Sequence, residues 1–424
     1  MRVLISTVGI AGLTAVASCY KPSIEACQLL CGSGTPACPN GLVCNNDGVC
    51  AVNQTDTCEP VNDSGMADAH VPIDTSCGWP VISNIDPCQL NASGVSSDVS
   101  FTNPTGDTLE LNFDPRIQHL SQLTPGAPTV SVLMARNLTI TSILQIRGNE
   151  PLIILVNGTA TIDASAMITW QAVMHQPETT CAGAGGNGGN GSGSCGAGGG
   201  GGGSLGALAS PSPVGGGAGG RGGDMPPGSK GLPGDPGEIQ SAPALVPLVT
   251  GCYGGSGGLT SGGSSAPGGG GGGGLQISAL TQIDVLGTID MKGYGGSGAS
   301  DSKGGGGGGG SGGAILLEAP QINFGAQSRL CANGGGGGQG VVSGAAEAGA
   351  AGSCTDQRAN GGGVVTGGDS TGGNGGATSG SASAGNMGSS FTGNGGGGGG
   401  GGVGRIRING TVTGAPGVMS PPAQ

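Results

Sequence analysis

Three aspartates are the residues of this chain whose types and spacing could support chemistry. Asp163 and Asp290 each close a Thr-Ile-Asp sequence, and Asp284 lies shortly before Asp290. If the two Thr-Ile-Asp sequences stack on neighbouring turns of a repeat, their carboxylates lie about 5 Å apart, a spacing that favours a bound cation. Paired carboxylates of this kind bind calcium or divide general acid and base roles between them. Lys292 is the basic residue beside them.

The same aspartates also have a structural interpretation, which we favour. Aspartate beside a glycine turn commonly forms the turn itself, and Asn323 takes the place of Asp284 in the next copy of its sequence. The three histidines, His70, His119 and His175, lie in different segments with no partner at metal-ligand spacing. No GxSxG, HExxH or Walker sequence occurs. The sequence therefore predicts no catalytic residues, no metal and no cofactor.

The composition narrows the classes of partner. The 424 residues carry a formal net charge of -12, and only 2% of them are aromatic and 9% charged. Nucleic acid is disfavoured as a partner, because there is no basic run and no set of aromatic side chains on which bases could stack. An acidic, weakly hydrophobic surface suits an exposed, solvated protein.

A repeated unit between residues 275 and 334 indicates the fold. The copies LQISALTQIDVLGTIDMKG and AILLEAPQINFGAQSRLCAN align residues 283–285 with 322–324 and residues 289–293 with 330–334. Apolar and polar residues alternate, which is typical of half-buried strands. The apolar set is Leu275, Ile277, Ile283, Val285, Ile289 and Met291, and the polar set is Gln276, Ser278, Asp284 and Asp290. With three strands and no helix per unit, the simplest repeat is one turn of a parallel β-helix.

Further strand-like runs extend this architecture over residues 98–424. The runs TLELNF, NLTIT, ILQIRG and PLIILVNGTATIDASA precede the repeat, and VGRIRINGTVTG follows it, with Ile406 and Ile408 inward and Arg405 and Arg407 outward. About six turns at about 4.8 Å each give a column roughly 30 Å tall. The predicted fold class is all-β: a short parallel β-helix (solenoid) with long glycine-rich inserts, preceded by a small disulfide-rich module.

Glycine supplies 102 of the 424 residues, in blocks that a side-chain core cannot use. Uninterrupted runs occupy residues 198–203, 268–274, 304–310, 334–338 and 395–402, within inserts that we place at 164–272, 294–312 and 334–400. Mobile loops are the default expectation, because ordering glycine has the largest backbone entropy cost. The alternative is packed, polyproline-II-like glycine segments hydrogen-bonded to one another, because the inserts leave and re-enter the column at corresponding points.

The N-terminus has the composition of an export signal. Residues 1–18 hold one charged residue, Arg2, then a largely apolar segment too short to span a membrane. The sequence Val16-Ala17-Ser18-Cys19 that ends it resembles the lipobox of bacterial lipoproteins, in which the cysteine is acylated and becomes the mature N-terminus. We therefore expect a lipid anchor at Cys19 and a location at the cell envelope, in the outer membrane or on the cell surface.

A cysteine-rich module follows at residues 19–60. A dense, even set of cysteines in a short exported segment predicts a disulfide framework, and six cysteines allow 15 pairings. The set is Cys27, Cys31, Cys38, Cys44, Cys50 and Cys58. Zinc is the less favoured alternative, because the paired C-x2-C spacing is absent and the nearest histidine is His70.

The other cysteines are sparse. Cys77 and Cys88, in the linker at residues 61–97, are expected to be bonded across a turn, and Cys331 and Cys354 straddle one glycine insert. The first insert, at residues 164–272, holds the remaining three, of which Cys181 could reach Cys195 or Cys252. Fourteen cysteines less Cys19 leave thirteen, so one thiol is left over within a single chain.

The combination of these features resembles the glycine-rich, PGRS-like surface lipoproteins of gliding soil bacteria. The likeness rests on the lipobox, the cysteine module and phrases such as GGGGGGGSGGAILLEA and GTIDMKGYGG, and it covers most of the chain. The resemblance implies a surface lipoprotein and supplies no catalytic residues.

We therefore expect a non-enzymatic, lipid-anchored cell-surface protein with a structural or adhesive role, in contact with the membrane through its anchor and with extracellular polysaccharide or other surface proteins. The alternative is a β-helix carbohydrate lyase or hydrolase that uses the outward carboxylates, with Trp170 and Tyr294 as sugar-stacking residues beside Asp163 and Asp290. A third reading, binding to ice or another flat surface, rests only on the packed-glycine alternative.

Overall fold

The computed structural model describes the chain in sections. They are residues 43–44, 50–51, 77–80, 82–171, 183–192, 195–205, 208–209, 212–213, 216–217, 230–238, 244–260, 265–300, 303–341, 346–363, 370–388 and 394–423. The chain divides into two compact units, Met1–Val71 and Pro72–Gln424. The predicted signal peptide and Cys19, Cys27, Cys31, Cys38, Cys58 and Cys181 lie outside the described residues.

The first unit contributes one described element, a short antiparallel strand pair. Strands β1 (Val43–Cys44) and β2 (Cys50–Ala51) lie side by side, with Cys44 opposite Cys50. The sequence places both residues in the predicted disulfide framework.

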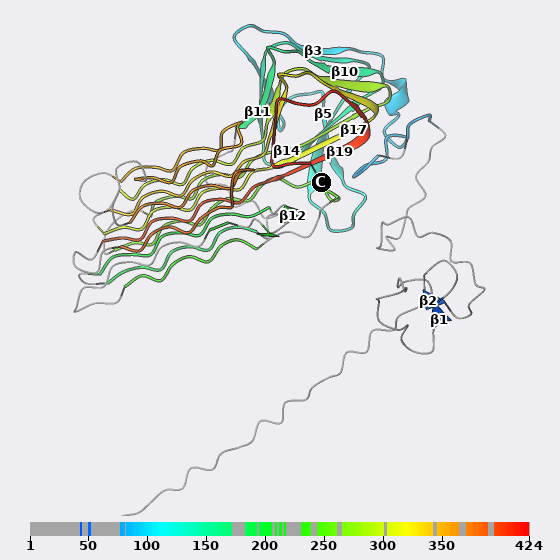
Figure 1. Cartoon of the computed structure of the whole chain (residues 1–424). Helices are drawn as coiled ribbons and strands as arrows, with labels where there is room; N and C mark the ends of the chain where they lie inside the picture. The colour runs from blue at the N-terminus through cyan, green and yellow to red at the C-terminus, as the bar shows by residue number, and fades with distance from the viewer. Residues whose placement is uncertain are drawn as a thin grey trace, which may run out of the picture. The chain divides into compact units, whose positions relative to one another are not determined.

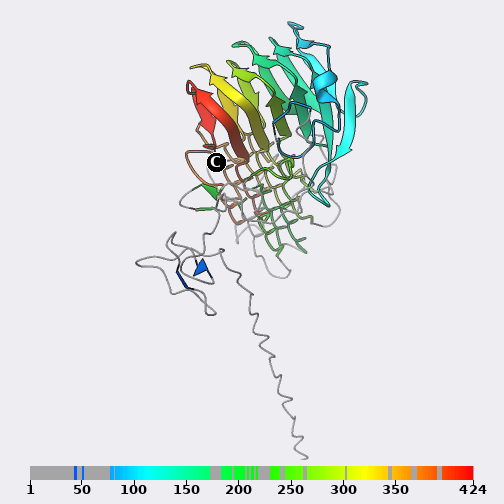
Figure 2. The same cartoon turned by 90° about the vertical axis from the view of Figure 1, so that its right-hand side faces the viewer.

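The second unit is all-β, and its strands form three sets of parallel neighbours (Figures 1 and 2). The first set is β6 (Thr129–Ala135), β9 (Leu152–Val156), β14 (Gly274–Ala279) and the first halves of β17 (Ala314–Phe324) and β19 (Arg405–Thr413). The second set is β3 (Val99–Phe101), β7 (Leu138–Ile140), β10 (Thr159–Ile162), β15 (Gln282–Val285) and the second halves of β17 and β19. The third set is β4 (Asp107–Glu110), β8 (Ile143–Arg147), β11 (Met167–Gln171), β16 (Thr288–Asp290), β18 (Arg329–Cys331) and β20 (Val418–Ser420).

The remaining elements are few. Strand β5 (Ile117–Ser121) pairs antiparallel with β6, and β12 (Leu208–Ala209) pairs antiparallel with β13 (Ser212–Pro213). Helical structure in the described part of the chain is limited to one 3-10 turn, η1 (Ala92–Gly94). None of the described residues belongs to a helix with the length and hydropathy needed to cross a bilayer.

The three strand sets surround one hydrophobic core. Alternate residues of each strand point inward, and the six apolar residues predicted for the first repeat copy all belong to this core. The strand pairing also matches the predicted alignment, because Asp284 lies opposite Asn323 and Asp290 opposite Cys331. The strand-like run TLELNF is a strand only in part, since β4 ends at Glu110 and Phe113 is 84% exposed.

The first strand set is buried on both faces. Strands β9 and β14 therefore show continuous burial instead of alternation. A second hydrophobic cluster covers their outer face, built from Trp79, Ile82, Ile85, Leu245 and Leu248 on Val132, Ile153, Leu155 and Leu316. Two segments distant in sequence, before the strands and inside the first insert, thus cover this face.

Candidate functional site

The glycine inserts leave and return at fixed points of the strand sets. Each insert follows a strand of the third set and precedes a strand of the first: residues 172–273 lie between β11 and β14, 291–313 between β16 and β17, and 332–404 between β18 and β19. Their described segments run side by side away from the strands (Figure 1). The first insert begins later than residue 164, because Met167–Gln171 form strand β11.

The glycine segments are joined by backbone hydrogen bonds that repeat every third residue. The N–H groups of Gly198 and Gly201 donate to Gly189 and Gly186, at 2.9 and 2.8 Å. The N–H groups of Gly200 and Gly203 instead donate to Gly306 and Gly309, both at 2.9 Å. A change of direction with a period of three is the geometry of polyproline II. The packed alternative therefore describes these segments, and the default expectation of loops without such pairing is wrong for them.

The described glycine segments of the three inserts together form the glycine bundle, and segment 304–313 lies in its middle. Its N–H groups donate to segments 252–258, 291–297 and 396–402. Its carbonyls accept from segments 200–203, 269–272 and 335–341, and from the Arg405 N–H. It is therefore enclosed on all sides by other extended backbones. Because its polar groups are paired in every direction, the segment needs no side chains to be buried.

This enclosure explains the uninterrupted glycine runs. A Cβ atom at Gly305 would lie 1.9 Å from the Gly198 carbonyl oxygen, and one at Gly308 would lie 1.9 Å from that of Gly201. The runs at residues 198–203, 304–310, 334–338 and 395–402 are buried throughout, whereas the run at 268–274 is only partly buried. A side chain has no space at successive positions of the four buried runs.

Segments at the perimeter keep glycine at the inward positions only. In the collagen-like sequence GLPGDPGE, Gly231, Gly234 and Gly237 are buried, whereas Leu232 and Asp235 are exposed. A Cβ at Gly234 would lie 2.1 Å from the carbonyl oxygen of Gly186. The triplet pattern thus reflects packing on neighbouring segments of the same chain.

Asparagine side chains complete the pairing at the edge of the bundle. The Oδ1 atoms of Asn187 and Asn190 accept hydrogen bonds from the N–H groups of Ser256 and Leu259, both at 2.8 Å. Asn187 and Asn190 are exposed, so their side-chain NH2 groups are available at the surface. These two residues were not predicted as part of a site, although the triplets GGNGGN repeat with the three-residue period of a polyproline-II helix.

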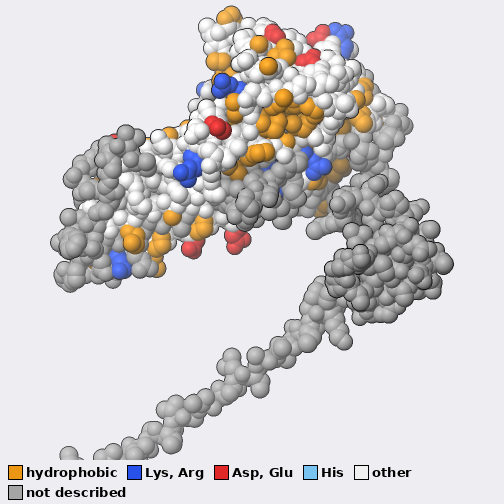
Figure 3. Space-filling view, in the orientation of Figure 1, with side chains coloured by type: hydrophobic (Ala, Val, Ile, Leu, Met, Phe, Trp, Pro, Cys, Tyr) orange, Lys and Arg blue, Asp and Glu red, His pale blue; other side chains and the backbone are white. Residues whose placement is uncertain are grey.

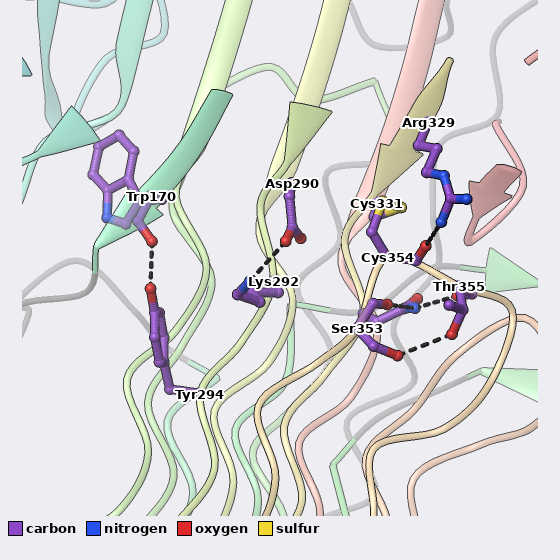
Figure 4. Close-up of polar contacts among 10 residues, drawn as sticks. Trp170, Asp290, Lys292, Tyr294, Arg329, Cys331, Ser353, Cys354 and Thr355 are labelled. Carbon is purple, nitrogen blue, oxygen red and sulfur yellow. Dashed lines mark hydrogen bonds and ion pairs between the residues drawn. A yellow bond between two sulfur atoms is a disulfide. The ribbon is translucent and has the colours of Figure 1, made fainter. Parts of the chain in front are cut away.

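Polar side chains gather where the glycine bundle joins the strands (Figure 4). The Asp290 carboxylate is 3% exposed and accepts a hydrogen bond from Lys292 Nζ at 2.8 Å. Burial raises the pKa of Asp290, while the charge of Lys292 opposes that rise. The Tyr294 hydroxyl donates to the backbone carbonyl of Trp170 at 2.5 Å, and the Trp170 side chain lies in the hydrophobic core.

The predicted pairing of Asp163 with Asp290 is wrong. Strand β16 places Asp290 opposite Thr169 of β11, in the third strand set. Asp163 follows β10, whose Thr161 lies opposite Asp284 in the second set. The two Thr-Ile-Asp sequences therefore belong to different strand sets, and their likeness does not mark equivalent positions. Asp284 instead accepts a hydrogen bond from Asn323 Nδ2 at 2.6 Å.

Two of the expected cysteine pairs lie in the described part of the second unit. Cys77 is bonded to Cys88, and Cys331 is bonded to Cys354 at the base of the third insert. Cys252 also takes part in a disulfide, and Cys195 is buried. The Cys331–Cys354 bond joins the end of β18 to a perimeter segment.

Of the three histidines, His119 lies in the described residues and has a local partner. Its Nδ1 atom is 2.6 Å from Glu150 Oε2. Burial works against ionisation of Glu150, but hydrogen bonds from His119, Thr129 and Ser131 keep the pKa of that carboxyl below its usual value. The described residues include no group of three or more histidine, cysteine or acidic side chains arranged to hold a metal ion.

Glu318 is a buried carboxylate that was not predicted from the sequence. It accepts hydrogen bonds from the Ser83 N–H and hydroxyl groups, Gln276, Ser278 and Asn409, at 2.7–3.1 Å. These contacts tie the covering segment around Ser83 to three neighbouring strands. A charged residue within AILLEAP, an otherwise apolar strand, was the available signal.

Comparison of the chain with protein-family models, with curated proteins and with solved structures finds no match. The glycine bundle and its perimeter side chains are a candidate site by their geometry alone.

Substitution inside the bundle tests the packing. We expect Gly308→Ala to lower the free energy of unfolding by about 3 kcal/mol, because the new methyl group has no space between hydrogen-bonded backbones. Urea unfolding measures this change, and hydrogen exchange of peptide 304–310 should accelerate. The exposed perimeter variant Ala348→Val is the control and should change stability by less than about 0.5 kcal/mol. Equal effects of the two variants would contradict the packing.

The pH dependence of stability tests the burial of Asp290. Since its folded pKa lies above the ordinary value of 3.8, the folded state holds this proton more tightly, and the contribution of Asp290 to stability falls as pH rises from 3.8 through the raised pKa. The stability difference between wild type and Asp290→Asn should therefore become less favourable to wild type over that range, as measured by urea unfolding at a series of pH values.

Asp98 provides a control of opposite sign. A hydrogen bond from Arg136 lowers the pKa of Asp98 to about 2. Its contribution to stability is present above 3.8 and is lost as pH falls through about 2. If the stability differences between wild type and each variant, Asp290→Asn and Asp98→Asn, changed in the same direction with pH, the burial of Asp290 would not govern its titration.

Proposed function

We propose that this chain is an exported, lipid-anchored surface protein in which a short parallel β-helix carries a glycine bundle that serves structure or adhesion. The order of strands along the chain supports the β-helix: each turn visits the first, second and third strand sets in succession, and equivalent strands pair in parallel. Each turn would bury its apolar face only by stacking on its neighbours.

The adhesive role is supported by the difference between the buried segments and the perimeter segments of the glycine bundle. Buried runs such as Gly304–310 pair their backbones with surrounding segments. Perimeter segments point their remaining side chains outward, as at Asn187, Asn190 and Asp235. This arrangement supports a rigid scaffold that displays short polar side chains over an extended surface.

Neutral polysaccharide is the partner class that this surface chemistry fits. Exposed amide groups such as those of Asn187 and Asn190 can bond sugar hydroxyl groups in large numbers, each contact being weak. Acidic polysaccharides fit less well, because the chain carries a net charge of -12. Adhesion of this kind would involve no chemical reaction and would need only a surface held in a fixed shape.

Binding to polysaccharide is the direct test. The oxidised chain from residue 20 onward should be retarded in gels containing dextran, a neutral polysaccharide, more than in gels containing alginate, an acidic one. The double variant Asn187→Asp/Asn190→Asp keeps the Oδ1 acceptors for Ser256 and Leu259 and replaces the outward NH2 donors by charged oxygens. We expect it to weaken retardation by dextran at least about threefold, since each lost donor contributes roughly 0.5–1.5 kcal/mol.

The control for this test adds two charges away from the bundle. Ser96 and Ser100 are exposed in the strand-forming part, so Ser96→Asp/Ser100→Asp should leave retardation by dextran unchanged. Absence of retardation by every polysaccharide tried, or equal loss in both double variants, would remove the adhesive role of this surface.

The lipid anchor has a separate test. Full-length chain produced in a Gram-negative host and labelled with a fatty-acid analogue should carry the label, and mass spectrometry should find a diacylglyceryl group on Cys19. Cys19→Ser should lose the label and move from the membrane fraction to the soluble exported fraction. An unlabelled wild-type chain that begins beyond Cys19 would contradict the anchor.

A further inference from the structure

One residue in three points outward along the outer segments of the glycine bundle. In segment 251–259, a Cβ at Gly254 would lie 2.2 Å from the Gly308 carbonyl oxygen in the middle of the bundle, and one at Gly255 would lie 2.0 Å from the Gly186 carbonyl oxygen. The remaining position of each triplet faces neither neighbour. Residues 253, 256 and 259 occupy it, and they are partly exposed while the rest of the segment is buried.

Two tyrosines lie in register at this surface. Three segments run side by side there: 251–259, 265–273 and 291–300. The Gly254 N–H donates to the Gly269 carbonyl at 2.9 Å, and the Tyr294 N–H donates to the Gly270 carbonyl at 2.8 Å. Tyr253 and Tyr294 therefore lie on opposite sides of the middle segment at the same level.

Two serines repeat this arrangement one triplet further along. The Gly257 N–H donates to the Ala266 carbonyl at 2.8 Å, and the Ser297 N–H donates to the Pro267 carbonyl at 3.0 Å. Ser256 and Ser297 therefore flank Pro267 as the tyrosines flank the glycine before them.

The middle segment carries no long side chain between the tyrosines. A Cβ at Gly269 would lie 2.1 Å from the Tyr294 carbonyl oxygen, and one at Gly271 would lie 2.0 Å from the Gly251 carbonyl oxygen. The outward position between them is Gly270, which is partly exposed. We call these six outward residues the tyrosine strip: Tyr253, Ser256, Pro267, Gly270, Tyr294 and Ser297.

The tyrosines of the strip are a large share of those in the chain. The sequence holds three tyrosines, and the two in the strip are both partly exposed. The Tyr294 hydroxyl donates to the Trp170 backbone carbonyl at 2.5 Å, which holds one of the two rings in place (Figure 4). A ring that is already held loses little conformational entropy when a ligand packs on it.

The strip carries no charge. Its six residues are uncharged, and Lys292, on the segment of Tyr294, is bonded to Asp290 at 2.8 Å. Figure 3 shows one face of the bundle, on which charged side chains are few and widely spaced. Aromatic rings beside a small number of hydroxyl groups are typical of sites for uncharged, partly apolar ligands.

We propose that the tyrosine strip binds a linear, neutral polysaccharide, which deepens the adhesive function proposed above and rests on it. A sugar ring packs its apolar C–H groups on the tyrosine rings above Gly270, and hydroxyl groups further along the chain bond Ser256 and Ser297. The tyrosine pair and the serine pair are three residues apart, about 9 Å in polyproline II, a length that roughly two sugar rings of an extended chain cover. Because the strip is straight and flanked on both sides, it fits an unbranched chain.

Affinity electrophoresis of the oxidised chain from residue 20 onward tests the strip, with hydroxyethylcellulose as an extended neutral glucan. Wild type should be retarded, and Tyr253→Ala should raise the dissociation constant at least about threefold, because the sugar loses a stacking surface. Tyr253→Phe keeps the ring and should stay within about twofold of wild type.

The matched control truncates an apolar side chain elsewhere on the bundle. Met387 is 67% exposed and lies in segment 381–388, which pairs with segments 370–377 and 394–404. Met387→Ala should therefore leave the dissociation constant for hydroxyethylcellulose unchanged.

Hydrogen exchange locates the ligand. Hydroxyethylcellulose should slow the exchange of peptide 265–273 in wild type and leave that of peptide 381–388 unchanged. Peptide 304–310 should exchange alike in wild type and Tyr253→Ala, because the side chain at residue 253 points away from the middle of the bundle. If Tyr253→Ala loosens peptide 304–310, the protection of peptide 265–273 in wild type still decides whether the strip binds.

The failure of the strip differs from the failure of the adhesive role. Wild type that is retarded by dextran but not by hydroxyethylcellulose overturns the strip alone. So does unchanged exchange of peptide 265–273, an equal loss of affinity in Tyr253→Ala and Met387→Ala, or an equal loss in Tyr253→Ala and Tyr253→Phe. Absence of retardation by every polysaccharide removes the strip and the adhesive role together.

Discussion

The hydrogen bond between two glycine backbones is the interaction on which the unusual part of this structure depends. It requires extended segments to approach so closely that a methyl group at Gly305 or Gly308 would overlap a neighbouring carbonyl oxygen. Glycine has the largest conformational entropy to lose on ordering, and these segments bury almost no apolar side chain in return. Full pairing of N–H and C=O groups on every side must therefore offset that cost.

The strands make this pairing attainable. Parallel strands hold their backbones about 4.8 Å apart, and each glycine segment is the direct continuation of a strand, as 304–313 is of β17 and 394–404 of β19. Neighbouring segments thus start in register at a hydrogen-bonding distance. One part of the chain is held by side chains such as Ile289 and Leu330, and the other mainly by backbone hydrogen bonds, yet the same lateral spacing runs through both.

Much of the strand arrangement could be predicted, because alternation carries the signal. The alignment that sets Asp284 on Asn323 rests on two copies with the same three-strand pattern, and the structure pairs them in that register. The predicted equivalence of Asp163 and Asp290 was wrong, since a likeness of three residues does not show which strand set each copy belongs to. The run TLELNF was expected to be a strand throughout, but alternation continues in the sequence beyond Glu110, the residue at which β4 ends. Burial of β9 on both faces has a signal in the sequence, since Leu152–Val156 is apolar at every position, but that run does not show which segment covers it, the one around Leu245 and Leu248.

The glycine bundle was harder to predict, because its pairing is non-local and its residues are chemically identical. The seven glycines at residues 304–310 do not indicate which segments lie beside them. The triplets around Asn187 and Asp235, in contrast, show a three-residue period in the sequence. Whether the glycine segments pack or remain unpaired loops depends on whether the strands place them side by side. Composition alone does not reveal this. The perimeter asparagines and Glu318 depend on the same tertiary placement.

The three-residue period of the perimeter has a consequence for how this protein can change over generations. Replacement at an outward position, such as Leu232 or Asp235, alters the surface and leaves the inward glycines in place. Insertion or deletion of a single residue would rotate the following segment by a third of a turn and drive side chains into backbone. Length variation in these segments should therefore be tolerated in steps of three residues, because only such steps keep every following glycine at an inward position.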